Sequence, residues 1–108
     1  MMKTVPVTQY LNGKLVASYA SMRVAAELSG ARANHISEVA NGVRKTTGGF
    51  SWKRGAVRKG AIAAISKGTV VATFNNIEAV GNATNVRTSY VLEALSGKRK
   101  TVSGYNWQ

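Results

Sequence analysis

The sequence lacks most of the side chains from which catalytic sites are built. It contains no cysteine, no aspartate and a single histidine, and its four acidic residues are all glutamate. Without cysteine there is neither a disulfide framework nor a thiolate zinc site. No pair of acidic residues has a spacing that would hold a metal against a phosphate, and the signature motifs of nucleotide-binding and hydrolase sites are absent. We therefore expect a binding protein without enzymatic activity, metal or cofactor.

Negative charge is scarce, and long apolar runs are missing too. Fifteen lysine and arginine residues against four glutamates give the 108-residue chain a formal net charge of +11. Such an excess repels itself unless an anionic partner neutralises it, so a polyanion is the expected ligand. Nothing approaches the roughly 18 apolar residues that span a bilayer, and the N-terminus has no secretory signal pattern. These features predict a protein of the host cytoplasm or nucleoid, without membrane contact.

What the sequence does contain is an internal repeat with a period of 55 residues. Residues 7–53 align with residues 62–108 without a gap, and 11 of the 47 aligned pairs are identical. The identical pairs include Arg32 with Arg87, Gly42 with Gly97 and Trp52 with Trp107. A fixed period of this size is typical of a duplicated supersecondary unit. We expect a first DNA-binding repeat over 1–53, a basic linker over 54–61 and a second repeat over 62–108.

Each copy opens with two β-rich runs, which we expect to form a hairpin. In the first copy the turn falls at Asn12-Gly13, a dipeptide that tolerates the positive φ angles of a tight turn. In the second copy Lys67-Gly68 takes the same place. The expected strands cover residues 5–11, 14–19, 61–66 and 69–74.

A short first helix should follow each hairpin. Ser21 and Asn76 are suited to cap its start, because their side-chain oxygens can accept a hydrogen bond from a free backbone N–H group. Gly30 and Asn85 are suited to the left-handed position after its end.

The second helix of each copy is predicted from apolar residues at i, i+3, i+4 spacing. We expect it over residues 33–41 and 88–96, with its buried face formed by Ile36, Val39, Ala40, Val91, Ala94 and Leu95. A basic segment and a short strand around Trp52 or Trp107 complete each copy. The fold class is α+β: two tandem ββααβ units, each a β-hairpin, a helix-turn-helix-like pair and a closing strand. Because a unit of about 47 residues buries little surface alone, we expect the units to pack together.

This order of elements, together with two short motifs, resembles the nuclease-associated modular DNA-binding repeat found in the tails of phage and intron-encoded homing endonucleases. The motifs are Ala20-Ser21-Met22-Arg23-Val24-Ala25-Ala26 and Gly48-Gly49-Phe50-Ser51-Trp52-Lys53 in the first copy and Ser103-Gly104-Tyr105-Asn106-Trp107 in the second. The likeness covers the second copy more loosely, since Glu78, Val80 and Gly81 interrupt the first motif there. It implies binding to double-stranded DNA, with the second helix in the major groove and the basic segment along phosphates. It supplies no nuclease domain.

The same residues suit DNA on chemical grounds. Helix-turn-helix modules contact bases from the start of the second helix, where arginine can bridge guanine O6 and N7 and asparagine can bridge adenine N6 and N7. The basic runs after the helix suit phosphates, which fix position without reading sequence. The expected DNA-binding residues are Arg32, Asn34, His35, Arg44 and Lys45 in the first copy, Lys53, Arg54, Arg58 and Lys59 at the linker, and Arg87, Ser89, Tyr90, Lys98, Arg99 and Lys100 in the second copy.

The leading hypothesis is a sequence-preferring or architectural DNA-binding protein, phage or mobile-element derived, with a role in transcription regulation or DNA architecture. Monomers with an internal repeat are expected, and tethering two modules raises affinity through effective concentration. RNA binding is the first alternative, and exposed aromatic residues would favour it over duplex DNA. A basic adaptor or inhibitor of an acidic host protein is the second, and a merely solvated basic face the third.

Two recurring residue types have structural interpretations instead. We expect Trp52 and Trp107 to lie in the core, and Glu38 and Glu93 to pair with nearby arginines. His35 and Glu38 are spaced to approach a metal, but Tyr90 replaces histidine in the other copy, which disfavours a metal site.

Overall fold

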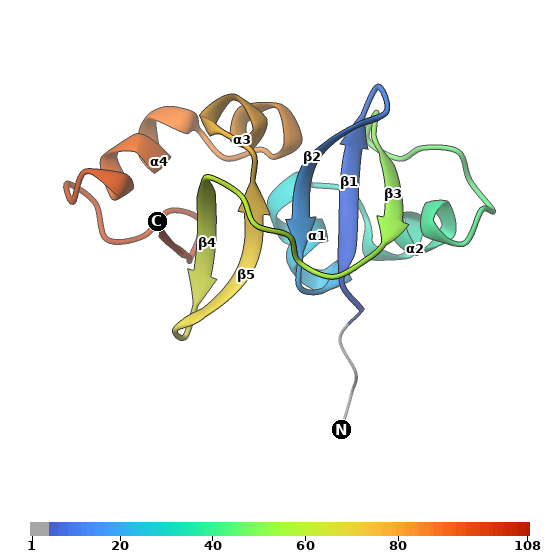
Figure 1. The fold of residues 1–108 in the computed structure, drawn as a ribbon, viewed down its shortest axis with the longest axis horizontal. Coiled ribbons are helices and arrows are strands. Elements are labelled where there is room, and N and C mark those ends of the chain that lie inside the picture. The colour runs from blue at the N-terminus through green and yellow to red at the C-terminus, as the bar shows by residue number, and fades with distance from the viewer. Residues whose placement is uncertain (1–4) are drawn as a thin grey trace.

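The computed structural model describes residues 5–108, so the first four residues of the predicted first repeat lie outside the described part. In chain order its elements are β1 (Val7–Leu11), β2 (Lys14–Tyr19), α1 (Met22–Ser29), α2 (Ala33–Ala40), β3 (Ser51–Arg54), β4 (Ile62–Ser66), β5 (Thr69–Phe74), α3 (Ile77–Ala83), α4 (Thr88–Leu95) and β6 (Asn106–Trp107). All six described strands belong to one antiparallel sheet in the order β3-β1-β2-β5-β4-β6 (Figure 1). The predicted α+β class is confirmed.

Both predicted hairpin turns are present. Asn12 and Gly13 have φ angles of 52° and 82°, and Lys67 and Gly68 have φ angles of 52° and 79°. Two successive positive φ angles twist a two-residue turn in the same sense as its strands. Asparagine and glycine adopt this conformation readily, and Lys67 adopts it at some cost in strain.

The first helix of each half begins at the predicted cap. Ser21 Oγ accepts a hydrogen bond from the Val24 backbone N–H at 3.2 Å, and Asn76 Oδ1 accepts one from the Ala79 N–H at 2.8 Å. Gly30 ends α1 in the left-handed conformation, with a φ of 82°. These three predictions are confirmed, and each depends only on residues close in the chain.

The prediction for the end of α3 is wrong. Thr84, with an extended backbone, takes the C-cap position in place of a left-handed Asn85. The Thr84 hydroxyl donates to the Val80 carbonyl at 2.6 Å and accepts from the Val86 N–H at 3.0 Å. Ser29 makes the equivalent two bonds in α1, where Gly30 is nevertheless left-handed, so these bonds do not decide the cap. What differs is a contact between the halves: Asn85 donates its N–H to the Leu28 carbonyl at the end of α1, at 3.0 Å.

The helices pack on one face of the sheet, over an aromatic core. Figure 1 shows α1 and α2 behind the strands of the first half, and both α1 and α3 contact the central strands β2 and β5. Tyr19 and Phe74 meet edge to face with ring centroids 6.0 Å apart, and each also packs against a tryptophan. Trp52 and Trp107 are 2% and 5% exposed, which confirms their predicted place in the core.

The predicted buried face of the second helices is confirmed only in part. Ile36, Val39 and Val91 are buried as expected, Ala40 and Ala94 are half-buried, and Leu95 is 38% exposed. Leu95 is the last residue of α4, which packs on the two-residue strand β6, whereas α2 packs on the four-residue strand β3. The shorter strand leaves the last turn of α4 without sheet to cover it.

The segment between β3 and β4 crosses the other face of the sheet, in front of the strands in Figure 1. Arg58 anchors it at the centre. Its N–H donates to Ser18 Oγ at 2.9 Å, and its carbonyl accepts from Thr73 Oγ1 at 2.6 Å. Ser18 and Thr73 are themselves hydrogen-bonded across β2 and β5 at 2.5 Å. The two halves of the chain therefore share one sheet, and the linker is fastened where they meet.

Within residues 5–108, no helix has the length and apolar character needed to cross a membrane.

Candidate nucleic-acid interface

The start of α2 presents polar groups to solvent. Arg32 occupies the N-cap position with an extended backbone (φ −78°, ψ 138°), and its own side chain does not cap the helix. Arg32 and Asn34 are exposed, whereas His35 is half-buried. The first N–H groups of a helix carry partial positive charge and can donate to an anion when no side chain caps them. This helix start has the groups that a phosphate or a base edge requires.

The start of α4 repeats the arrangement and adds an aromatic ring. Arg87 is the N-cap residue, again with an extended backbone and no cap from its own side chain, and Ser89 is exposed. The guanidinium carbons of Arg87 and Arg99 lie 5.7 Å and 4.1 Å from the centroid of the Tyr90 ring. Both are cation–π contacts. They bring a predicted base-contact residue and a predicted phosphate-contact residue to one place.

A glutamate on each second helix fastens the basic segment that follows. Arg44 Nε lies 3.3 Å from Glu38 Oε1, and Arg99 Nη2 lies 3.2 Å from Glu93 Oε1, which confirms the predicted pairing. These ion pairs are more than 40% exposed and so contribute little stability. Their effect is to position the arginines beside the helix. The other predicted contacts in these segments, Lys45, Lys98 and Lys100, are exposed.

The linker cations lie elsewhere. All four predicted linker contacts are exposed: Lys53, Arg54, Arg58 and Lys59. Because Thr8 pairs with both Ser18 and Lys53, these three side chains share one face of the sheet, the face that the linker crosses. The backbone of Arg58 is bound on that face as well. The structure therefore does not bring Lys53 and Arg58 together with the helix starts.

Sequence reasoning missed an apolar residue on the exposed side of α4. Leu92 is 51% exposed, and it stands three residues after Ser89 on the same side of the helix. The repeat alignment places Ser37 at the corresponding position in the first half. That difference could have been noticed in the sequence. On a helix predicted to contact bases, a leucine in place of a serine offers an apolar contact instead of a hydrogen bond, and so suits different base edges.

The two helix starts form two clusters. We define the first cluster as Arg32, Asn34, Glu38 and Arg44, and the second cluster as Arg87, Ser89, Tyr90, Glu93 and Arg99. Figure 1 shows α2 and α4 near opposite ends of the molecule, whose longest extent is 42 Å. A single ligand that touches both clusters must therefore be extended.

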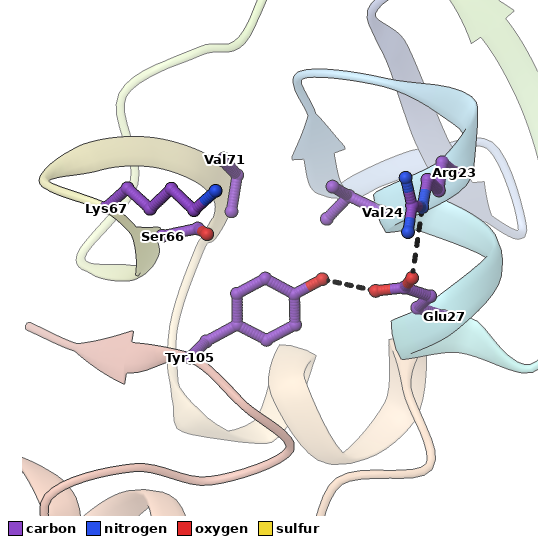
Figure 2. Close-up of a pocket in the computed structure, with 7 residues that line it drawn as sticks. All are labelled: Arg23, Val24, Glu27, Ser66, Lys67, Val71 and Tyr105. Atoms are coloured by element: carbon purple, nitrogen blue, oxygen red, sulfur yellow. Dashed lines mark hydrogen bonds and ion pairs between the residues drawn. The ribbon is translucent and has the colours of Figure 1, made fainter.

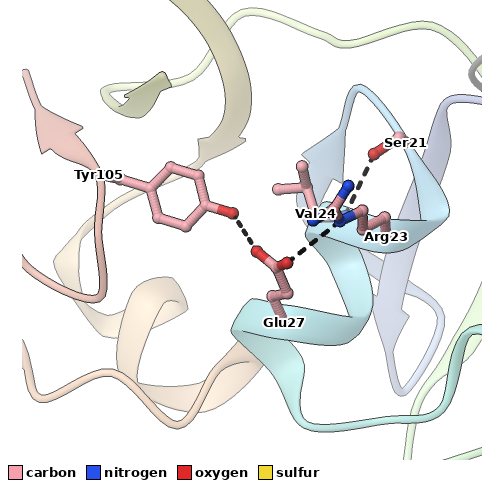
Figure 3. Close-up of polar contacts among 5 residues, drawn as sticks. All are labelled: Ser21, Arg23, Val24, Glu27 and Tyr105. Carbon is pink, nitrogen blue, oxygen red and sulfur yellow. Dashed lines mark hydrogen bonds and ion pairs between the residues drawn. The ribbon is translucent and has the colours of Figure 1, made fainter. Parts of the chain in front are cut away.

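A pocket of about 290 Å³ separates α1 from the turn between β4 and β5. Figure 2 shows the Tyr105 ring at its edge, with the phenol directed toward Glu27 on α1. The Tyr105 hydroxyl donates to Glu27 Oε2 at 2.6 Å, and Arg23 Nε lies 3.4 Å from Glu27 Oε1 (Figure 3). Burial, followed by the hydrogen bond to Glu27, raises the pKa of Tyr105 to about 12.

The single carboxylate in the lining of this pocket, that of Glu27, is already shared between a phenol and a guanidinium. The contact between Glu27 and Tyr105 joins residues 78 apart in the chain, so no local sequence pattern predicts it. Its evident role is to hold the end of the second half against α1.

Among residues 5–108, no three histidine, cysteine or acidic side chains lie close enough together to hold a metal ion. Comparisons of the chain with protein-family models, with curated proteins and with solved structures found no match.

Proposed function

We propose that the chain is a double-stranded DNA-binding protein made of two ββααβ units, with the start of α2 in one major-groove segment and the start of α4 in another. One observation carries the proposal. In both halves an arginine stands at a helix start that it does not cap, and a second arginine is held against the same helix by a glutamate. On this proposal the first arginine reads bases and the second contacts phosphate.

The spacing of the elements supports two equivalent units. Each element of the second half begins 55 residues after its counterpart, as β1 and β4 begin at residues 7 and 62 and α2 and α4 begin at residues 33 and 88. The resemblance to the DNA-binding repeats of homing endonucleases points the same way. We assign the chain no catalytic step, and we place it among phage or mobile-element proteins that regulate transcription or shape DNA.

The net charge of +11 supports a polyanionic ligand and predicts strong dependence on salt. If about six to ten phosphates are neutralised, affinity should fall on the order of 10³- to 10⁵-fold between 50 and 200 mM salt. The test is fluorescence anisotropy of labelled duplex DNA, single-stranded DNA and an RNA hairpin, each over a salt series. A preference for duplex with a steep salt slope supports the proposal, and indiscriminate binding that vanishes near physiological salt contradicts it.

Two variants separate the assigned roles. Arg44→Ala with Lys45→Ala should weaken binding to every duplex and lower the salt slope by about 2, since each phosphate contact contributes about 0.9. Asn34→Ala should alter preference among sequences and leave the slope nearly unchanged. Lys14→Ala with Arg23→Ala removes the same charge from exposed residues outside the two clusters and serves as the control. Equal effects of all three changes on every sequence would defeat the assignment.

RNA or single-stranded DNA is a second candidate ligand, and one observation favours it. Tyr90 is 37% exposed, and two guanidinium carbons lie 5.7 Å and 4.1 Å from its ring centroid; exposed aromatic rings and guanidinium planes are both groups on which an unpaired base can stack. Among the aromatics at the end of each half, Trp52, Tyr105 and Trp107 are buried and Phe50 is half-buried. If single strands are the ligand, Tyr90→Ala should weaken RNA binding far more than duplex binding.

A further inference from the structure

We infer that the two units meet DNA in opposite orientations, so that the preferred target is an imperfect inverted repeat and not a direct repeat. The inference rests on the proposed function and names the arrangement of its target. A repeat in the sequence leaves this open, because successive units can be related by a translation or by a rotation. The contact between the two halves decides between them.

The register of β2 on β5 indicates a two-fold rotation. Ser18 pairs with Thr73, which is its own counterpart 55 residues later. On either side, Ala17 pairs with Phe74, which is the counterpart of Tyr19, and Tyr19 pairs with Ala72, which is the counterpart of Ala17. For antiparallel neighbouring strands this pattern results from a two-fold axis perpendicular to the sheet through the central pair.

Contacts around this axis agree with the register. The hydrogen bond between Ser18 Oγ and Thr73 Oγ1 joins equivalent atoms, and the edge-to-face contact of Tyr19 with Phe74 joins equivalent rings. Arg58 donates its N–H to one of the two hydroxyls and accepts from the other, so the linker crosses at the axis. Exchanging each strand for its counterpart turns the strand order β3-β1-β2-β5-β4-β6 into the same order read from the opposite edge of the sheet, as a two-fold axis requires.

A rotation about the sheet normal keeps α2 and α4 on the same side of the sheet but reverses their directions. B-DNA has two-fold axes of its own, and paired helix-turn-helix modules exploit them by reading half-sites about one helical turn apart, roughly 34–36 Å. The molecule is 42 Å long, so its two helix starts can be separated by at most about one turn of DNA and cannot reach half-sites two turns apart. The half-sites should therefore be inverted, with centres at most about one turn apart.

The target is imperfect because the reading residues differ. The starts of the two helices read Arg-Ala-Asn-His over residues 32–35 and Arg-Thr-Ser-Tyr over residues 87–90. The shared arginine should select the same base in both half-sites, and the remaining positions should differ.

A symmetrised variant makes the orientation visible. Thr88→Ala, Ser89→Asn and Tyr90→His give α4 the reading residues of α2, and all three positions lie on the helix surface, where Thr88 is half-buried and the other two are exposed. Duplexes selected by this variant from a random library should share a palindromic consensus. An inverted pair of half-sites should then bind roughly 5- to 150-fold more tightly than a direct pair, because the direct pair loses the specific contacts of one helix. The reciprocal variant, Ala33→Thr with Asn34→Ser and His35→Tyr, should select a different palindrome.

The outcomes are distinct. A direct-repeat consensus, or a single half-site, would overturn this inference and leave DNA binding by the helix starts standing. Failure of the native protein to prefer duplex DNA would overturn both. If the variants do not fold, hydroxyl-radical footprints of the native protein decide, since protection related by a two-fold axis supports the inference and protection repeated by translation overturns it.

Discussion

A buried polar chain across the interface of the two halves offers the sharpest test of the fold. The Tyr19 hydroxyl donates to Gln9 Oε1 at 2.6 Å, and Gln9 Nε2 donates to the Ala83 carbonyl at the end of α3, at 3.0 Å. Tyr19 and Gln9 are both fully buried. Tyr19→Phe leaves the Gln9 oxygen without a donor and should cost about 1–3 kcal/mol of the free energy of unfolding. Because each kcal/mol corresponds to about 4–8 °C for a domain of this size, the melting temperature should fall by several degrees.

Gln9→Leu makes the prediction more specific. It leaves two buried groups without partners, the Tyr19 hydroxyl and the Ala83 carbonyl, whereas the double variant with Tyr19→Phe leaves only the carbonyl. The double variant should therefore be no less stable than Gln9→Leu alone, with a coupling free energy of roughly 0.5–3 kcal/mol between the two changes. Tyr10→Phe is the control, expected within about 0.5 kcal/mol of the native protein, since Thr8 Oγ1 keeps the Lys53 carbonyl as an acceptor at 3.2 Å.

Urea denaturation followed by tryptophan fluorescence measures these differences. Trp52 and Trp107 are 2% and 5% exposed, so their emission should shift to longer wavelength on unfolding. The reasoning is refuted if Tyr19→Phe costs no more than Tyr10→Phe, or if the two single changes add up in the double variant. Either result would mean that the hydroxyl does not satisfy the Gln9 oxygen.

Three further predictions concern the linker, the alkaline stability and base selection. Gly60→Ala would place a Cβ atom 2.5 Å from the Phe74 carbonyl oxygen and should cost about 1–3 kcal/mol in urea unfolding, whereas Gly55→Ala meets only ordinary contacts at 3.6 Å and should be nearly neutral. Because the pKa of Tyr105 is raised to about 12, the unfolded chain releases its phenolic proton first between pH 10 and about 12, and stability should fall as the pH rises through that range. Tyr105→Phe should make this fall shallower in urea titrations at a series of pH values, and an unchanged slope would contradict the pKa assignment. Under the proposed function, the half-exposed Leu92 suits a thymine methyl group. Uracil in place of thymine should therefore weaken DNA binding by the native protein but not by the Leu92→Ser variant, and equal losses of affinity in both would exclude that contact.

Features that depend on neighbours in the chain could be predicted from the sequence. The turns at Asn12-Gly13 and the caps at Ser21 and Asn76 follow from residues no more than three positions apart. The end of α3 did not follow in this way. The Ser29 hydroxyl bonds back to the Ala25 carbonyl at 2.6 Å just as Thr84 bonds back in α3, yet α1 ends at a left-handed Gly30 and α3 has no left-handed cap, so the shared hydroxyl is no signal for the difference.

Features that depend on distant contacts could not be predicted. The pairing of β2 with β5 has no local signature, and without it neither the shared sheet nor the path of the linker follows. The candidate site divides in the same way. Each of Glu38 and Glu93 was expected to pair with a nearby arginine, and the partner lies only six residues away in the chain. The face on which Lys53 lies, in contrast, depends on how β3 pairs with β1.

The continuous sheet also sets how much variation in spacing the protein can accept. Two modules on a flexible tether can follow half-sites that move apart, and their joint affinity then depends on effective concentration. Here β2 and β5 are hydrogen-bonded to each other, so one half cannot turn without breaking the sheet. Each base pair inserted between half-sites moves the second by about 3.4 Å and rotates it by about 34–36° around the duplex. On our proposal the protein would therefore recognise one spacing, and a single inserted base pair would cost the contacts of a whole helix.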